Sequence, residues 1–222
     1  MDFLFLAGTQ LFQGLSPEEI KALLPLLQAV LRRGEKGEVL LLAGDTTRRM
    51  GLVLEGRVRM ERDDVWGGRA ILGQAGPGQV FGETYACIPG EPLMVSAVAD
   101  QPCQVLFLTP GALLSGGPPV PRQEVLLQNL LTLTARKNLE LSRRSFYASP
   151  KTIRGRLLAY LSDQALLSGG PAFSIPFDRQ QLADYLGVDR SALSHELGKM
   201  SREGLLRVKK NRFFLSAPRW NE

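Results

Sequence analysis

The sequence has little of what metal sites and most active sites require. Among 222 residues there are one histidine, His195, and two cysteines, Cys87 and Cys103. Two cysteines cannot hold a four-thiolate iron–sulfur cluster, and no histidine–cysteine cluster has zinc spacing. A β-barrel oxygenase would need two histidines and a carboxylate for its metal. We therefore expect no catalytic residues, no metal site and no enzyme.

Long apolar runs are also absent. The longest extend over four or five residues, against the roughly 20 that cross a bilayer. The start, MDFLFLAG, contains Asp2 and no basic residue, so it lacks the charged front of a secretory signal. We expect a cytoplasmic protein without a membrane partner.

Charge is unevenly divided along the chain. Residues 1–144 contain 15 basic and 15 acidic side chains, whereas residues 145–222 contain 12 and 7, which places the whole excess of +5 in the last third. A basic C-terminal part favours a polyanion as its partner.

The residue pattern changes twice along the chain. A helix start signal, Ser16-Pro17-Glu18-Glu19, opens the segment 16–33. From about Gly34 to Leu108, short β-favouring segments alternate with Gly, Pro and Asp about every ten residues, which is typical of an all-β barrel or roll. After GGPPVP at 116–121, a helix is expected to about Arg144, and another over 150–167.

The first of these two helices carries a wide leucine stripe. At about 100° per residue its leucines fall within an arc of about 160°; they are Leu126, Leu127, Leu130, Leu131, Leu133 and Leu141. Such a stripe suits a helix that covers its own domain and also meets a symmetry mate. An ordinary buried helix is the alternative.

The C-terminal segment reads as a helix-turn-helix. After a short strand at 174–177, Asp178 can cap a helix that Gly187 ends, and Asp189 can cap a second helix that ends at Gly204. LLRVKKNRFFLS then predicts a hairpin with a basic tip, a wing. The outward residues of the second helix are expected to contact base edges, and nearby cations to contact phosphates. The base-contact residues are Arg190, Ser191, Ser194 and His195, and the phosphate-contact residues are Arg179, Lys199, Arg202, Lys209, Lys210 and Arg212.

The whole pattern resembles the CRP/FNR family of transcription regulators. The likeness rests on Gly44-Asp45, on LEGRVRM around Gly56, on GPGQVFGE at 76–83 and on GVDRSALSHELGKMSREGLL near the C-terminus. It implies an α+β fold with an antiparallel β-roll (a double-stranded, cupin-like β-helix) at 1–117, a dimerisation helix at 118–146 and a winged helix-turn-helix at 147–222. It also implies a homodimer on near-palindromic double-stranded DNA that acts with RNA polymerase. Family members often carry Glu at the position of Ser191 and Arg at that of His195, so the DNA half-site cannot be inherited; His195 could be a plain surface residue.

The resemblance does not extend to a cyclic-nucleotide site. In members that bind cyclic nucleotides, the segment after Gly82-Glu83 supplies Arg and Ser or Thr to the phosphate. Here no Lys or Arg occurs between Arg69 and Arg122, and a buried phosphodiester without a cation is poorly compensated. We expect an unknown small-molecule effector, apolar or neutral rather than a cyclic nucleotide, in a pocket formed by Gly82, Glu83, Tyr85, Cys87, Leu93, Met94 and Val95.

Three alternatives stay open at this point. The roll could hold haem, with Cys87 as the thiolate ligand, although its lack of histidine argues against this. Cys87 and Cys103 could form a redox switch instead of being structural thiols. The C-terminal hairpin could act through protein contacts rather than on DNA, against which the basic wing argues.

Overall fold

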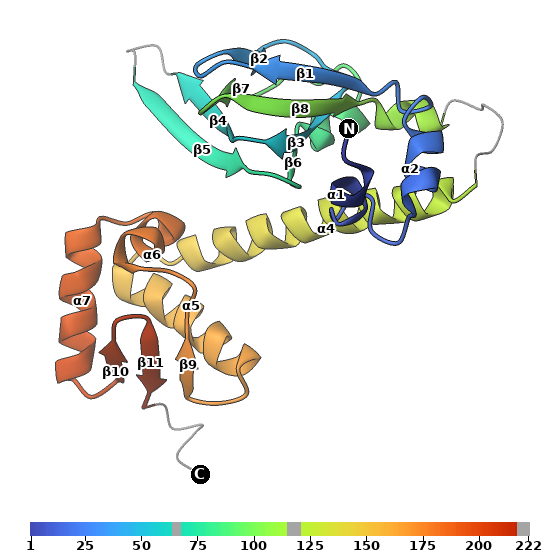
Figure 1. The fold of residues 1–222 in the computed structure, drawn as a ribbon. Coiled ribbons are helices and arrows are strands. Elements are labelled where there is room, and N and C mark those ends of the chain that lie inside the picture. Colours follow the sequence, from blue (N-terminus) through green and yellow to red (C-terminus); the bar gives the residue numbers. More distant parts are fainter. Residues whose placement is uncertain (64–67, 115–120, 217–222) are drawn as a thin grey trace. The chain divides into compact units, whose positions relative to one another are not determined.

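The computed structural model describes residues 1–63, 68–114 and 121–216 and divides the chain into two compact units, residues 1–136 and 137–222 (Figure 1). The predicted boundary at 117/118 lies outside the described residues. Across the part of the chain that is described, no helix is long and apolar enough to cross a membrane.

Short helices flank the strands of the first unit. They are α1 (Phe3–Ala7), α2 (Pro17–Leu23), α3 (Glu83–Cys87) and the 3-10 helix η1 (Pro110–Leu114). The predicted start of α2 is confirmed: Ser16 and Glu19 form a capping box. The helix is shorter than the segment 16–33, however, because Pro25 cannot continue it and β1 begins at Val30.

Two antiparallel four-stranded sheets form the predicted roll. The first has the order β1–β8–β3–β6, with β1 at Val30–Gly34, β8 at Cys103–Leu108, β3 at Met50–Glu55 and β6 at Val80–Phe81. The second has the order β2–β7–β4–β5, with β2 at Val39–Leu41, β7 at Ser96–Ala99, β4 at Val58–Asp63 and β5 at Arg69–Ala75. Side chains of both sheets share one core, in which Val58 and Ala99 of the second sheet pack with Val105 and Phe107 of the first. The antiparallel β-roll is therefore confirmed.

One long helix, α4 (Gln123–Ala148), follows the roll. Its predicted leucine stripe is split in two. Leu126, Leu130 and Leu133 are buried in the core that α1 and α2 also form, whereas Leu131 and Leu141 are 62% and 65% exposed. The side-chain amide of Asn129 donates to the carbonyls of Leu11 and Gln13 and holds the helix to the first unit. The exposed leucines lack a covering partner within the described chain.

The second unit packs three helices on a small sheet. Its elements are α5 (Ile153–Leu167), α6 (Arg179–Leu186), α7 (Arg190–Arg202) and the strands β9 (Ala172–Ser174), β10 (Leu206–Lys209) and β11 (Arg212–Leu215) in the order β10–β11–β9. The strand predicted at 174–177 lies two residues earlier, because the pairing of Phe173 with Phe213 sets its place. Leu182, Leu193 and Leu197 are buried in a common core with that sheet.

Substitution at two glycines tests the turns of the roll. Gly44 and Gly56 both have positive φ, 89° and 80°, so alanine at either position is expected to cost about 1–2 kcal/mol. A Cβ at Gly44 meets nothing within 4 Å, but at Gly56 it would overlap the Pro102 carbonyl oxygen. Gly56→Ala should therefore lower the free energy of unfolding more than Gly44→Ala in urea titrations followed by circular dichroism. Equal losses would contradict the packing at Gly56.

Two neighbouring residues of α7 have opposite environments, one in the core and one at the surface. Leu193 is fully buried and Ser194 is exposed. Leu193→Ala should destabilise the second unit by about 2–5 kcal/mol, since it leaves a cavity. Ser194→Ala should change stability by no more than about 0.5 kcal/mol. Thermal unfolding of both variants checks this, and a large loss for Ser194→Ala would mean that the helix faces are reversed.

Candidate nucleic-acid interface

Local signals define the two helices of the predicted helix-turn-helix. Asp178 caps α6 through a capping box with Gln181, and Gly187 ends the helix in the left-handed conformation, with φ of 63°. Asp189 then caps α7 by accepting a hydrogen bond of 2.9 Å from the backbone N–H of Ala192. The predicted caps and turn are confirmed.

A residue from outside the motif holds the turn in place. The guanidinium of Arg156, on α5, donates to the carbonyls of Leu186 and Gly187 at 3.0 Å each and to that of Pro150 at 2.9 Å. Charged donors make stronger hydrogen bonds than neutral ones. The end of α6 is thereby fixed relative to α5.

A second arginine of α5 holds α7, the second helix of the predicted helix-turn-helix, which is called the recognition helix below. Arg154 donates to Glu196 at 2.6 Å and to Glu203 at 2.9 Å, on the middle and the end of α7. Both carboxylates raise the pKa of Arg154, so it stays charged. Neither Arg154 nor Arg156 was identified as functional from the sequence, since their partners in the helix-turn-helix lie 30 to 49 residues away.

Aromatic side chains attach α6 to the end of α4. Tyr147 of α4 makes an edge-to-face contact with Tyr160 of α5, which in turn contacts Tyr185 of α6. The hydroxyl of Tyr185 donates to Glu140 at 2.8 Å, and that of Tyr147 donates to Asp163. Burial is the largest cause that raises the pKa of Tyr147 and Tyr185, and their carboxylate partners raise it further. Both phenols are therefore hydrogen-bond donors at neutral pH.

The N-terminal half of α7 presents a polar face to solvent. The four residues that were expected to contact bases are all exposed there: Arg190, Ser191, Ser194 and His195. The hydroxyl of Ser191 donates to the carboxylate of Asp189, and this bond is the largest cause that lowers the pKa of Asp189. With its proton engaged, the Ser191 oxygen keeps its lone pairs free and can accept a hydrogen bond.

A cleft of about 650 Å³ lies between the start of α6, the start of α7 and the tip of the β10–β11 hairpin. Three of the predicted residues line it, namely Arg179, Arg190 and Lys210. Gln180 and Asn211 also line the cleft. They were not identified as functional residues from the sequence, although each directly follows a predicted phosphate contact. The cleft thus brings three cations together at the start of α6, where Asp178, the acidic residue among the described lining residues, already caps the helix.

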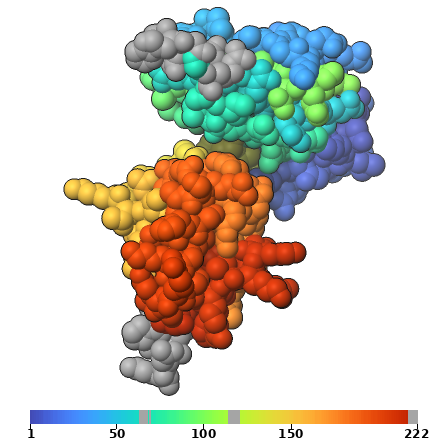
Figure 2. Space-filling model, turned by 90° about the vertical axis from the view of Figure 1, so that its left-hand side faces the viewer, coloured from blue at the N-terminus to red at the C-terminus, as the bar shows by residue number. Residues whose placement is uncertain are grey.

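The wing carries cations on a tight turn. Lys209 and Arg212 are paired residues of β10 and β11, and Lys210 lies in the turn between them with φ of 56°. All three side chains are exposed, and Figure 2 shows side chains projecting from this red end of the chain. Arg179 is held differently, since its guanidinium lies 5.5 Å from the Phe213 ring and burial lowers its pKa.

Two predicted phosphate contacts lie apart from this cleft. Lys199 and Arg202 are exposed in the last turn of α7, about 14 Å and about 18 Å along the helix from Arg190 at about 1.5 Å per residue. The structure therefore places four predicted cations near the wing or its cleft, with Arg190 beside them, and two at the far end of the recognition helix.

The residues predicted to form an effector pocket occupy the segment around α3. Glu83 and Leu93 are buried, whereas Met94 is 61% exposed and Cys87 is also exposed. Gly82 caps α3 in the left-handed conformation, and the Tyr85 hydroxyl accepts a hydrogen bond from the backbone N–H of Met94. The seven residues are neighbours, but their side chains do not all face one enclosed space; Val95 is half-buried.

The two thiols differ in their surroundings. Cys103 is buried in the core of the roll, and both cysteines are free thiols. Burial is the largest cause that raises the pKa of each, and for Cys87 the nearby Glu83 carboxylate adds to it. Within the described residues no group of three or more His, Cys, Asp or Glu side chains could hold a metal ion.

Comparisons with known proteins match both units. Residues 31–115 match the family model of the cyclic nucleotide-binding domain, and residues 155–219 match that of the Crp-like helix-turn-helix domain. The "Cyclic AMP receptor protein" of Thermus thermophilus is 32% identical over 205 residues, which cover 90% of this chain and 89% of that protein. A "CRP-like cAMP-activated global transcriptional regulator" of Mycobacterium tuberculosis is 27% identical, with 91% and 90% covered.

A solved structure agrees with these sequence matches. The catabolite activator protein of Thermus thermophilus is 30% identical, superposes with a TM-score of 0.52 and covers 93% of each chain. These relatives are regulators, as the lack of catalytic residues led us to expect, and not enzymes. On the sequence motifs, the β-roll, the helix-turn-helix and these matches, the chain belongs to the CRP/FNR family of transcription regulators.

Proposed function

We propose that the protein binds near-palindromic double-stranded DNA as a homodimer and regulates transcription, together with RNA polymerase, in the cytoplasm. The observation that carries the proposal is the cleft that brings Arg179, Arg190 and Lys210 together beside the exposed face of α7. A recognition helix enters the major groove with its N-terminal residues foremost. The cleft then faces the phosphates that border the groove.

The exposed residues divide into two roles. Arg190 can donate two hydrogen bonds to guanine O6 and N7, while Ser194 and His195 lie beside it on α7. Ser191 acts as an acceptor, which suits the amino group of cytosine or adenine. The remaining cations supply contacts to phosphates that do not depend on sequence; they are Arg179, Lys199, Arg202, Lys209, Lys210 and Arg212.

Two kinds of substitution distinguish these roles. Arg190→Ala should weaken binding to the preferred site by about 1–3 kcal/mol and relax the base preference, because a base contact is lost. Lys209→Ala should weaken binding to every sequence alike and reduce the salt slope by about one. Lys210→Gly should do the same without backbone strain, since Lys210 has a positive φ of 56°. Fluorescence anisotropy on duplex DNA across a chloride series measures all three.

The same titration of the wild-type protein distinguishes DNA binding from the alternative function, in which the C-terminal hairpin acts through protein contacts. Affinity for DNA should fall steeply with salt, because bound cations release counterions from the phosphates. A protein that acts only through protein contacts would give no binding, or an affinity that salt hardly changes. A loss of preference at a single base pair for Lys209→Ala would contradict the placement of the wing.

The outer face of α4 supports the homodimer. Leu127, Leu131, Thr134, Asn138 and Leu141 follow one another at alternating steps of four and three residues, the spacing of a coiled-coil seam. Leu131 and Leu141 are both more than 60% exposed in the single chain. Two such helices packed side by side would remove these leucines from water, which favours association.

Charged residues in this seam should separate the protomers. The double variant Leu131→Asp/Leu141→Asp should be a monomer in sedimentation velocity at a concentration where the wild type is a dimer, because aspartates would face each other. Leu166→Asp/Leu167→Asp changes two exposed leucines of α5 and serves as the matched control. A control that also dissociates would place the interface elsewhere.

The effector of this protein is proposed to be a small molecule other than a cyclic nucleotide. The two cited relatives are named for cAMP, but here Leu93, Met94 and Val95 occupy the place of the polar pair that would bind the phosphate. Leu93 is buried and Met94 faces solvent. The raised pKa of both thiols argues against a redox switch, because the thiolate is the reactive form.

Calorimetry tests this proposal. Titration of millimolar cAMP into the full-length protein should give no heat of binding, because no cation is supplied to the buried phosphodiester. The Thermus thermophilus relative, measured in parallel, serves as the positive control. Saturable binding of cAMP to the wild-type protein would overturn the assignment.

A further inference from the structure

A second cleft lies in the first unit, away from the residues predicted to form the effector pocket. Its volume is about 850 Å³. It is lined by the chain after α2, the loop between β2 and β3, the end of α3 and the start of η1, through Pro25, Leu26, Gln28, Arg48, Arg49, Ala86, Pro89, Thr109, Gly111 and Ala112. None of these described lining residues is acidic.

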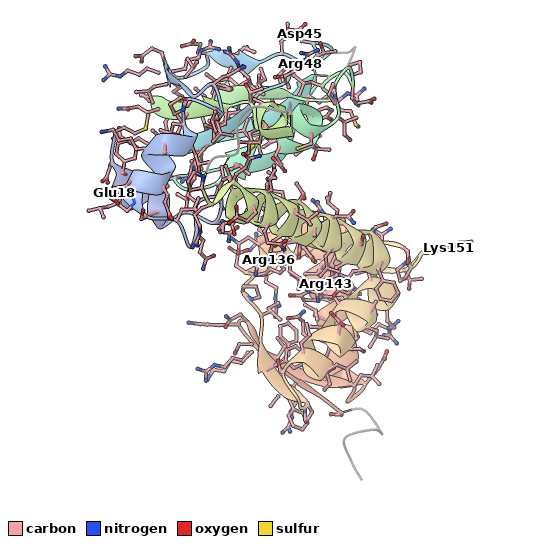
Figure 3. All side chains as sticks on the ribbon, turned by 90° about the vertical axis from the view of Figure 1, so that its right-hand side faces the viewer. Glu18, Asp45, Arg48, Arg136, Arg143 and Lys151 are labelled. Carbon is pink, nitrogen blue, oxygen red and sulfur yellow. The ribbon has the colours of Figure 1, made fainter. Side chains whose placement is uncertain are left out.

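Two neighbouring arginines supply the charge of this cleft. Arg48 and Arg49 form no ion pair with any carboxylate in the described chain. Their loop is shaped locally, since the hydroxyl of Thr47 accepts from the backbone N–H of Arg49 at 3.0 Å. Figure 3 shows Arg48 at the edge of its unit near Asp45, which is not a lining residue. Guanidinium groups bind phosphate and carboxylate with two parallel hydrogen bonds.

A buried hydroxyl in the same cleft lacks a partner. The Oγ1 atom of Thr109 is inaccessible to solvent and makes no hydrogen bond. Buried polar atoms are nearly always paired, so an exception needs an explanation. The backbone N–H of Thr109 donates to Leu27 at 2.7 Å, which fixes this residue against the chain after α2.

The backbone beside Thr109 is also unusual. Gln28 has a φ of 49°, although it is not a glycine. Left-handed conformations of such residues are strained, and the strain is often stored at functional sites. Gln28 is the only polar uncharged residue besides Thr109 among the described residues that line the cleft. Strain, an unpaired hydroxyl and two unpaired cations therefore meet in one place.

We propose that this cleft is a binding site for a small organic anion that carries a phosphate or a carboxylate. Arg48 and Arg49 bind the anionic group, and Gln28 binds the polar body of the ligand. Ala86 and Pro89 lie in or next to α3, so an occupant of the cleft also contacts the segment where the effector pocket is proposed. The site lies in the first unit, apart from the helix-turn-helix of the second.

Calorimetry on the full-length protein in a chloride buffer tests the site with pyrophosphate and citrate as probes and glycerol as the uncharged control. At least one of the two anions should bind, and glycerol should not. A comparison of pyrophosphate with citrate shows whether the site prefers a phosphate or a carboxylate. Arg48→Gln/Arg49→Gln should weaken that binding by at least about tenfold, as expected when hydrogen bonds to a charged group are lost. Arg33→Gln/Arg57→Gln has the same change in net charge on exposed residues outside the cleft, and it should bind like the wild type.

Gln28→Gly separates a ligand contact from a structural role. It removes the side chain at a position whose φ of 49° glycine adopts without strain, so it should weaken anion binding while the melting temperature stays the same or rises. The proposal is overturned if neither anion binds the wild type, if both arginine pairs have equal effects, or if only an acidic peptide such as polyglutamate binds. Without added anion, the DNA affinity of these variants, measured by fluorescence anisotropy, should match that of the wild type, because the substituted residues lie in the first unit. A loss of anion binding can therefore be distinguished from a loss of DNA binding.

Discussion

The DNA-binding unit depends on one interaction, the contact of the half-buried Arg156 guanidinium with the end of α6. A turn between two helices exposes carbonyl groups that the helices themselves cannot pair. Arg156 satisfies two of them and a third on the chain that precedes α5. Lysine could not replace it, since a single ammonium lacks the fork of donors that reaches three oxygens. This contact fixes the end of α6 relative to α5, while Arg154 holds α7 to the same helix.

Around that contact, charge is used in two ways. Arg154 and Arg156 act inside the protein, on carboxylates and carbonyls of α6 and α7. Arg190 and Lys210 face solvent and remain available for a polyanion. The excess of basic residues in the C-terminal third therefore overstates the charge that DNA would meet. The geometry, rather than the count, distinguishes the cations that orient the motif from those that could bind.

Local signals made the helix-turn-helix predictable, whereas long-range packing limited the rest. Asp178, Gly187 and Asp189 act on residues three or four positions away, so their roles were clear from the sequence. The strand at 172–174 was misplaced because its register depends on β11, about 40 residues later. The cleft beside Arg48 and Arg49 joins four separate segments. No periodicity in the sequence could have indicated that these segments meet.

The wing has a further consequence for how the protein can vary. Leu206 and Val208 alternate with exposed residues along β10, and along β11 the buried Phe213 and Leu215 alternate with the exposed Arg212 and the half-buried Phe214. One extra residue within either strand would turn every following side chain to the opposite face. The buried aromatic ring of Phe213, stacked on Phe173, would then point into water. The composition of the wing tip is therefore free to vary, whereas a single residue inserted into one of its strands requires a β-bulge to keep the buried side chains in place.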